Sequence, residues 1–248
     1  MTTTDELAHR GEPDGISVVR WFALYAVILA AAGGSLAILL ARQTGGSLDS
    51  WAHFKSSLPE MSQAVKLLTF AIYVSLGCTF LPLPVNWIVA AVATRTVAVG
   101  TGMWDTVLLV GTIGAAASTI ANLNDYHLFT WMLRSHRIAS VRHTRIYALA
   151  ARWFDKSPFF LVVVFNILPI PVDVVRMLAA SHRYSRAAFA AANFVGRFIR
   201  YGAIAYLVYY FELSVETAML IMLALAAAML IAKVLPRLWS SEKAPEAS

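Results

Sequence analysis

The chain has 248 residues, of which 59% are hydrophobic and 14% are charged, and its formal net charge is +6. Soluble domains average about 45–50% apolar and about 25% charged residues, so this composition is typical of a membrane protein. The basic residues flank apolar runs and form no nucleic-acid-binding motif, so no nucleic-acid partner is expected. A single cysteine, Cys78, excludes an intrachain disulfide framework.

The first apolar segment, residues 21–41, is uncharged and long enough to cross a bilayer as a helix. Its length favours an uncleaved anchor over a signal peptide. Residues 1–20 are expected to form a tail before it. Residues 42–66 are mixed in character and are expected to form an interfacial segment.

Two later apolar segments are interrupted by prolines, so that each half is too short to span a bilayer. They cover residues 67–93, with LPLP inside, and residues 157–181, with LPIP inside. Three uninterrupted segments are expected to be transmembrane helices, over residues 104–133, 187–211 and 217–235. The sequence therefore predicts an all-α membrane protein with about four transmembrane helices. Residues 236–248 form the remaining tail.

The distribution of basic residues predicts the orientation. Residues 134–156 contain six Lys or Arg residues and are expected in the cytoplasm, whereas the turn at 211–216 has two glutamates and no basic residue. Both termini are then cytoplasmic. These assignments agree only if each proline-broken segment enters and leaves the membrane on one side, the first from outside and the second from inside.

The two broken segments follow one pattern, LPLPVN from Leu81 and LPIPVD from Leu168. Entry from opposite faces is typical of an inverted repeat. We therefore predict two re-entrant helical hairpins, although two ordinary proline-kinked helices remain an alternative. The residues expected to shape the hairpins are Pro82, Pro84, Pro169, Pro171, Gly114 and Gly196.

Two pairs of charged residues stand out near the second broken segment. Asp173 and Arg176 are three residues apart and share a helix face, so they either neutralise each other or present Arg176 to a lipid phosphate. Arg197 and Arg200 have the same spacing. They are interpreted either as an anchor at the cytoplasmic surface or as a cationic lining beside the second hairpin.

Asp125 lies in the helix expected over residues 104–133. An uncompensated carboxylate is costly in lipid, so it is expected to face the bundle interior or the cytoplasmic boundary and to pair with Arg197 or Arg200. His127 is expected at the membrane interface.

Several stretches between residues 70 and 211 resemble the DedA superfamily, also called the VTT-domain or SNARE-associated Golgi protein family, and its YqaA-like branch in particular. They are FLPLPVNW, GAAASTIANLNDY, FNILPIPVDVVRMLAASHRYSRAAF and NFVGRFIRYGAIAY. The resemblance implies a VTT-like domain over residues 67–211 with two re-entrant hairpins. It also implies movement of phospholipids or of a polyprenyl-phosphate carrier between leaflets, with proton coupling proposed for some members.

The chain departs from this family at two positions. An acidic residue that often follows the first hairpin's proline is Asn86 here, and an arginine that often precedes the second hairpin's proline is Asn166. Proton coupling through the usual acid is therefore not implied, and Asp173 is the candidate to replace it. The predicted substrate-binding residues are Asn86, Asp125, Asn166, Asp173, Arg176, Arg197 and Arg200.

No motif of an intramembrane protease or a zinc enzyme is present, so we expect no enzyme, no metal and no cofactor. The predicted function is a lipid transporter or scramblase in the inner (cytoplasmic) membrane, acting on lipids with anionic phosphate head groups. The alternatives are a non-transporting membrane scaffold or envelope-homeostasis factor, and a proton-coupled small-solute transporter. The lipid's identity is left open, as is a homo-oligomeric state.

Overall fold

A computed structural model describes the protein over residues 15–44, 60–79, 84–132, 154, 156–168, 173–182, 184–214, 216–218, 220–221 and 224. All regular elements within these residues are α-helices, which confirms the all-α class. The basic segment 134–156, the expected helix 217–235 and the interfacial segment 42–66 lie largely outside them. Of the four motif prolines, only Pro84 is described.

Three long helices form the frame of the molecule: α2 (Gly15–Thr44), α6 (Met103–Met132) and α10 (Arg186–Tyr210). Each contains or closely matches one of the uninterrupted segments predicted from the sequence. Among the described residues, α2 and α6 are long and apolar enough to cross a membrane. The match reflects long, mostly apolar runs without proline, which favour a continuous helix because it satisfies every backbone group.

Each proline-broken segment consists of two short helices. The first contains α4 (Gln63–Gly77) and α5 (Val85–Ala93), and the second contains α8 (Pro158–Ile167) and α9 (Asp173–Ser181). The two helices of each segment contact each other, so we call them the first and the second hairpin. The breaks coincide with the LPLP and LPIP motifs, as predicted.

The end of α8 illustrates how proline produces such a break. Leu168 follows the last helical residue and has φ −75° and ψ 144°, an extended conformation. The residue before a proline is disfavoured in the helical region because its own backbone meets the proline ring. Leu168 precedes Pro169, so the sequence itself ends the helix there. Pro158, at the other end of α8, occupies a first-turn position where its missing N–H costs nothing.

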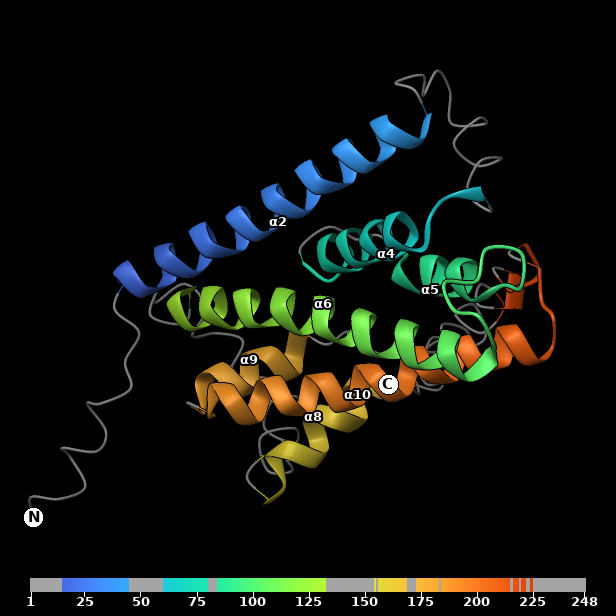
Figure 1. Ribbon diagram of the computed structural model, residues 1–248. Coiled ribbons are helices and arrows are strands. Elements are labelled where there is room, and N and C mark those ends of the chain that lie inside the picture. Colours follow the sequence, from blue (N-terminus) through green and yellow to red (C-terminus); the bar gives the residue numbers. More distant parts are fainter. Residues whose placement is uncertain are drawn as a thin grey trace, which may run out of the picture.

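α6 and α10 lie side by side in antiparallel directions and form the centre of the bundle (Figure 1). The hairpins are arranged around them in a related way. The first helix of each hairpin packs on the long helix that follows it in sequence, α4 on α6 and α8 on α10. The second helix packs on the long helix of the other half, α5 on α10 and α9 on α6. Each hairpin therefore contacts both long helices.

Two glycines permit the close contacts of α4 with α6 and of α8 with α10. A Cβ atom on Gly114 of α6 would lie 2.7 Å from the Tyr201 ring and 3.0 Å from the Phe70 ring. A Cβ atom on Gly196 of α10 would lie 2.6 Å from the Asn166 Cβ and 2.7 Å from a backbone oxygen of α8. Both glycines therefore allow close helix approach.

The apolar core is divided into two clusters. One involves α4, α5, the first part of α6 and the last part of α10, and the other involves α8, α9, the end of α6 and the start of α10. Between them, along both long helices, lies a layer of buried polar side chains. Its members on the two long helices are Asn122, Asn124, Asp125, Asn193 and Arg197.

Candidate functional site

The buried polar layer is completed by residues from both hairpins. Arg176 enters from α9 and Asn166 from the last turn of α8, and both residues are at most 6% exposed. Polar groups in an apolar interior are costly unless they are paired. Their partners therefore define what this layer can do.

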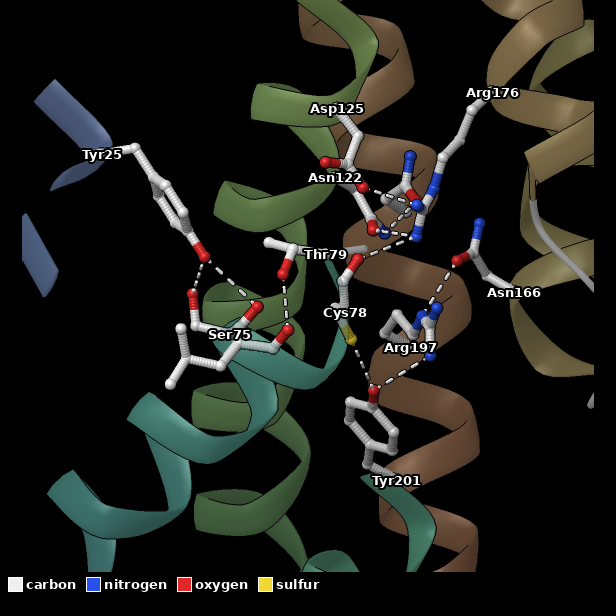
Figure 2. A network of polar contacts seen from close by, with 12 residues as sticks. Tyr25, Ser75, Cys78, Thr79, Asn122, Asp125, Asn166, Arg176, Arg197 and Tyr201 are labelled. Atoms are coloured by element: carbon white, nitrogen blue, oxygen red, sulfur yellow. Dashed lines mark hydrogen bonds and ion pairs between the residues drawn. The ribbon is translucent and has the colours of Figure 1, made fainter. Parts of the chain in front are cut away.

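Arg176 holds several elements together (Figure 2). Its guanidinium donates to Asp125 Oδ2 at 2.6 Å and to Asn122 Oδ1 at 2.5 Å, both on α6. It also donates to the backbone oxygen of Cys78 at 3.2 Å, just beyond the last turn of α4. Both side chains of this ion pair are nearly inaccessible: the exposed fraction is 7% for Arg176 and 1% for Asp125. The planar fork of an arginine suits such simultaneous contacts.

A chain of amides extends this contact to α10. The Asn122 amide donates to Asn193 Oδ1 at 2.8 Å, and Asn193 in turn donates to the backbone oxygen of Phe189 at 2.8 Å. Asn122 therefore uses its oxygen for Arg176 and its nitrogen for α10. The two long helices are connected by polar contacts as well as by packing.

Arg197 of α10 is buried among uncharged partners. Its Nε donates to Asn166 Oδ1 at 3.0 Å, and one terminal nitrogen donates to the Tyr201 hydroxyl at 3.0 Å (Figure 2). The Tyr201 hydroxyl also lies 3.7 Å from the Cys78 sulfur. Arg197 is 6% exposed, and no carboxylate among the described side chains forms an ion pair with it. It therefore contributes an uncompensated positive charge within the described part.

Arg200, one turn further along α10, contacts both hairpins. It donates to Asn86 Oδ1 of α5 at 3.0 Å and to the backbone oxygen of Leu168, at the end of α8, at 3.4 Å. Its side chain is half-buried, and Leu168 beside it is 41% exposed. Arg200 therefore lies at the edge of the polar layer, between its interior and the outside of the bundle.

An arginine contacts the end of the first helix of each hairpin, α4 and α8. A helix leaves its last carbonyl groups without intrahelical partners, and an arginine side chain can satisfy them. The Cys78 oxygen at the end of α4 accepts from Arg176, and the Leu168 oxygen at the end of α8 accepts from Arg200. Both breaks are thus held at the polar layer by side chains from the second half of the chain.

α2 is attached through a few aromatic contacts. The Tyr25 hydroxyl lies 3.2 Å from the backbone oxygen and 3.0 Å from the hydroxyl of Ser75 on α4 (Figure 2). Trp21 stacks on His127 of α6 with ring centroids 4.9 Å apart. Most other large side chains of α2 are exposed, so this helix lies on the outside of the bundle.

The structure brings most predicted site residues together but changes their pairing. Asp125 faces the interior, as expected, but its ion pair is with Arg176, whereas the sequence predicts Arg197 or Arg200. The reason is that α9 packs against α6, which brings Arg176 within hydrogen-bonding distance of Asp125. The side chain of Asp173 lies outside the described part, so its pairing with Arg176 remains a prediction.

The side chain of His127, which is expected at the membrane interface, is fully buried beneath Trp21. Neither ring nitrogen has a hydrogen-bond partner in the described part of the chain. Asn193 and Tyr201 also belong to the polar layer, although they were not among the residues predicted from the sequence. An asparagine in a helix interior was the available signal for Asn193, whereas nothing in the sequence distinguishes Tyr201 from a core aromatic residue.

Within the described residues, no three His, Cys, Asp or Glu side chains come together to hold a metal ion. What the site offers is donors: guanidinium groups and amides, which suit oxygen-rich anions. Comparison of the chain with family models, with curated proteins and with solved structures finds no match. The fold and site define an all-helical bundle with two apolar helices long enough to cross a membrane and a buried cationic polar layer.

Proposed function

We propose that the protein is an integral membrane lipid transporter or scramblase of the DedA type, which moves a phospholipid or a polyprenyl-phosphate carrier between leaflets. The observation that carries this proposal is the buried polar layer, which both hairpins and two long helices form and which contains three arginines, Arg176 of α9 and Arg197 and Arg200 of α10. A charged head group cannot cross an apolar membrane unassisted. Irregular backbone and polar groups at membrane depth are tolerated where they line such a path.

The proposed topology places both hairpins as re-entrant segments. α5 has nine residues and a length of about 14 Å, less than half of the about 30 Å of a hydrocarbon core. α2, α6, α10 and the segment 217–235 would supply the four transmembrane helices. The positive charge of the segment 134–156 supports a cytoplasmic position for that segment and for both termini, in a protein of a bacterial inner membrane.

The two positions at which the chain departs from the DedA pattern support a particular version of this function. Asn86 accepts a hydrogen bond from Arg200, and Asn166 accepts one from Arg197. Amides do not titrate, so the contacts of both arginines are independent of proton binding at these positions. We propose that lipid movement does not require protonation at residue 86.

The hydrogen-bond partners of the three arginines support different roles for them, one structural and two in contact with the lipid head group. Arg176 is engaged by Asp125 and Asn122, which supports a role in holding α9 on α6 rather than in gripping lipid. Arg197 and Arg200 have uncharged described partners and are the better candidates for contact with a head group.

Reconstitution tests the proposal directly. Purified protein is placed in liposomes with a trace of fluorescent anionic phospholipid, and a membrane-impermeant quencher is added. Lipid movement is expected to expose label from both leaflets, and Arg200→Gln is expected to slow this exposure while Arg95→Gln does not. Arg95 is a suitable control because its pair with Glu212 is solvent-exposed, at 52% and 63%. Quenching confined to the outer leaflet, with and without a pH gradient, would contradict the proposal.

The alternatives give different results in the same system. Flux of a small solute without lipid movement would favour a small-solute transporter. Absence of both would favour a non-transporting membrane factor.

A further inference from the structure

We propose that Arg197 and Arg200 form the binding site for one phosphate monoester group, and that this site prefers a monoester over a phosphodiester. The inference rests on the proposed function in that the natural ligand would be the head group of the transported lipid. It starts from the charges of the polar layer, from the neighbours of the two arginines and from the exposure of Arg200.

The first step is the charge of the layer. Asp125 is buried against Arg176 at 2.6 Å, so these two charges offset each other. Arg197 and Arg200 then contribute two further positive charges, and their described partners are amide, hydroxyl and carbonyl oxygens. Hydrogen bonds to neutral oxygens satisfy donors but do not cancel charge. The described part of the layer is therefore cationic by two charges.

The second step is the position of these charges. Residues three apart on a helix are neighbours on its surface, and like charges at this spacing destabilise a helix. Burying a charge without a counter-charge costs several kcal/mol more, on the order of the desolvation of one ion. Neutral Gln side chains could donate to the same oxygens without that cost. The arrangement is explained if a bound anion supplies the missing negative charge.

The third step is access. Arg197 is 6% exposed, whereas Arg200 is half-buried and lies beside Leu168, which is 41% exposed. An anion approaching from the Leu168 side would meet Arg200 first and Arg197 one turn away along α10. The exposed apolar side chain of Leu168 at this edge suits a ligand that carries acyl or prenyl chains behind its phosphate.

The fourth step is the class of anion. A phosphate monoester carries about −1.5 to −2 charges at neutral pH and has three terminal oxygens. A phosphodiester carries a single charge and two terminal oxygens. Two adjacent guanidinium groups carry two positive charges, which match the charge of the monoester. Each is a planar fork of N–H donors, and together they can serve its three terminal oxygens. Phosphatidic acid, a polyprenyl phosphate and inorganic phosphate share this chemistry.

Binding measurements in detergent test the inference without transport. Short-chain phosphatidic acid and phosphatidylglycerol with the same acyl chains are titrated calorimetrically into the full-length protein at about pH 8, where the monoester is almost fully dianionic. Phosphatidic acid is expected to bind at least about 10-fold more tightly, the difference made by one charge-assisted hydrogen bond. Equal affinity for both lipids would overturn the proposal.

Variants locate the site. Arg200→Gln is expected to weaken phosphatidic acid binding by about 10-fold or more and to abolish the preference, whereas Arg95→Gln keeps both. Arg200→Lys retains the charge but not the fork, and is expected to give an intermediate affinity. Arg197→Gln is measured in parallel, with its melting temperature as a check on folding. A preference unchanged in Arg200→Gln would place the monoester elsewhere and overturn the assignment.

Inorganic phosphate identifies the source of the ligand. If inorganic phosphate competes with phosphatidic acid at similar concentrations, the ligand of the site is a free anion. If phosphate competes at least about 100-fold more weakly, the ligand is a lipid. Either result agrees with a monoester site. The binding experiment and the liposome experiment can fail independently. Monoester binding in detergent without lipid movement in liposomes would support this site and refute the transport function. Lipid movement without monoester preference would do the reverse.

Discussion

Arg176 of α9 lies 2.6 Å from Asp125 of α6, and fewer than a tenth of either side chain is accessible. This buried ion pair joins the second hairpin to the central helix of the first half. Breaking a buried pair on one side leaves a charge without compensation, which commonly costs about 3–5 kcal/mol. The pair is therefore a sensitive test of the described architecture.

We expect Arg176→Ala to lower the free energy of unfolding by about 3 kcal/mol or more, because it leaves the Asp125 carboxylate buried without its ion-pair partner. Asp125→Asn combined with Arg176→Gln should recover part of this loss, since both charges are removed together. Denaturant unfolding of the single and double variants in detergent measures the coupling. Equal effects of Arg176→Ala and of Arg95→Ala, at an exposed pair, would contradict the pairing.

Glycine substitutions test the close helix approach. Gly114→Ala and Gly196→Ala place a Cβ within 2.7 Å and 2.6 Å of side-chain atoms, so each is expected to cost about 1–3 kcal/mol through overpacking. Gly33 and Gly34 of α2 have nothing within 4 Å of the place that a Cβ would take, so alanine there should be neutral or stabilise the helix by up to about 1 kcal/mol. Melting temperatures of the four single variants separate the two classes. Similar shifts for all four would refute the close packing at Gly114 and Gly196.

His127→Phe addresses a buried ring whose nitrogens have no hydrogen-bond partner in the described part. Replacing it with an apolar ring should remove the desolvation cost of these nitrogens and keep the stack on Trp21. We expect the melting temperature to stay equal or to rise, by the equivalent of about 1 kcal/mol. Tyr25→Phe is the matched comparison, because it loses the contact with Ser75 and should destabilise. A drop for His127→Phe larger than that for Tyr25→Phe would show that the imidazole has a polar role.

Asn86→Asp places a carboxylate where the Arg200 guanidinium now donates to an amide at 3.0 Å. A charged acceptor strengthens such a hydrogen bond by about 1 kcal/mol. We expect this variant to be more stable and to bind phosphate monoesters about 10-fold more weakly, because the new carboxylate competes for Arg200. Calorimetric titration and the melting temperature check both effects. Unchanged affinity together with a raised melting temperature would argue against Arg200 as a ligand.

The long helices and the breaks were predictable because they depend on local sequence. Long, mostly apolar runs without proline predict α2, α6 and α10 to within a few residues at most ends. The main exception is α2, which begins at Gly15, six residues before the predicted start. A proline restricts the residue before it, as Leu168 shows, and so marks the end of a helix.

The pairing within the polar layer was not predictable in the same way. The sequence predicts Arg197 or Arg200 as the partner of Asp125, and helical spacing favours Asp173 as the partner of Arg176. The choice depends on how α9 packs on α6, a contact between segments about fifty residues apart. The burial of His127 has the same origin, since it results from α2 crossing α6 and not from the neighbours of His127 in the sequence.

The Cys78 carbonyl at the end of α4 is satisfied by Arg176, which lies about a hundred residues later in the chain. A ribosome would therefore release the whole first hairpin before the side chain that completes it has been synthesised. During that interval the carbonyl group at the end of α4 needs another hydrogen-bond donor, such as water. Assembly of the two halves is thus a late step in folding, because the contact that completes the first hairpin forms only after the second hairpin has been synthesised.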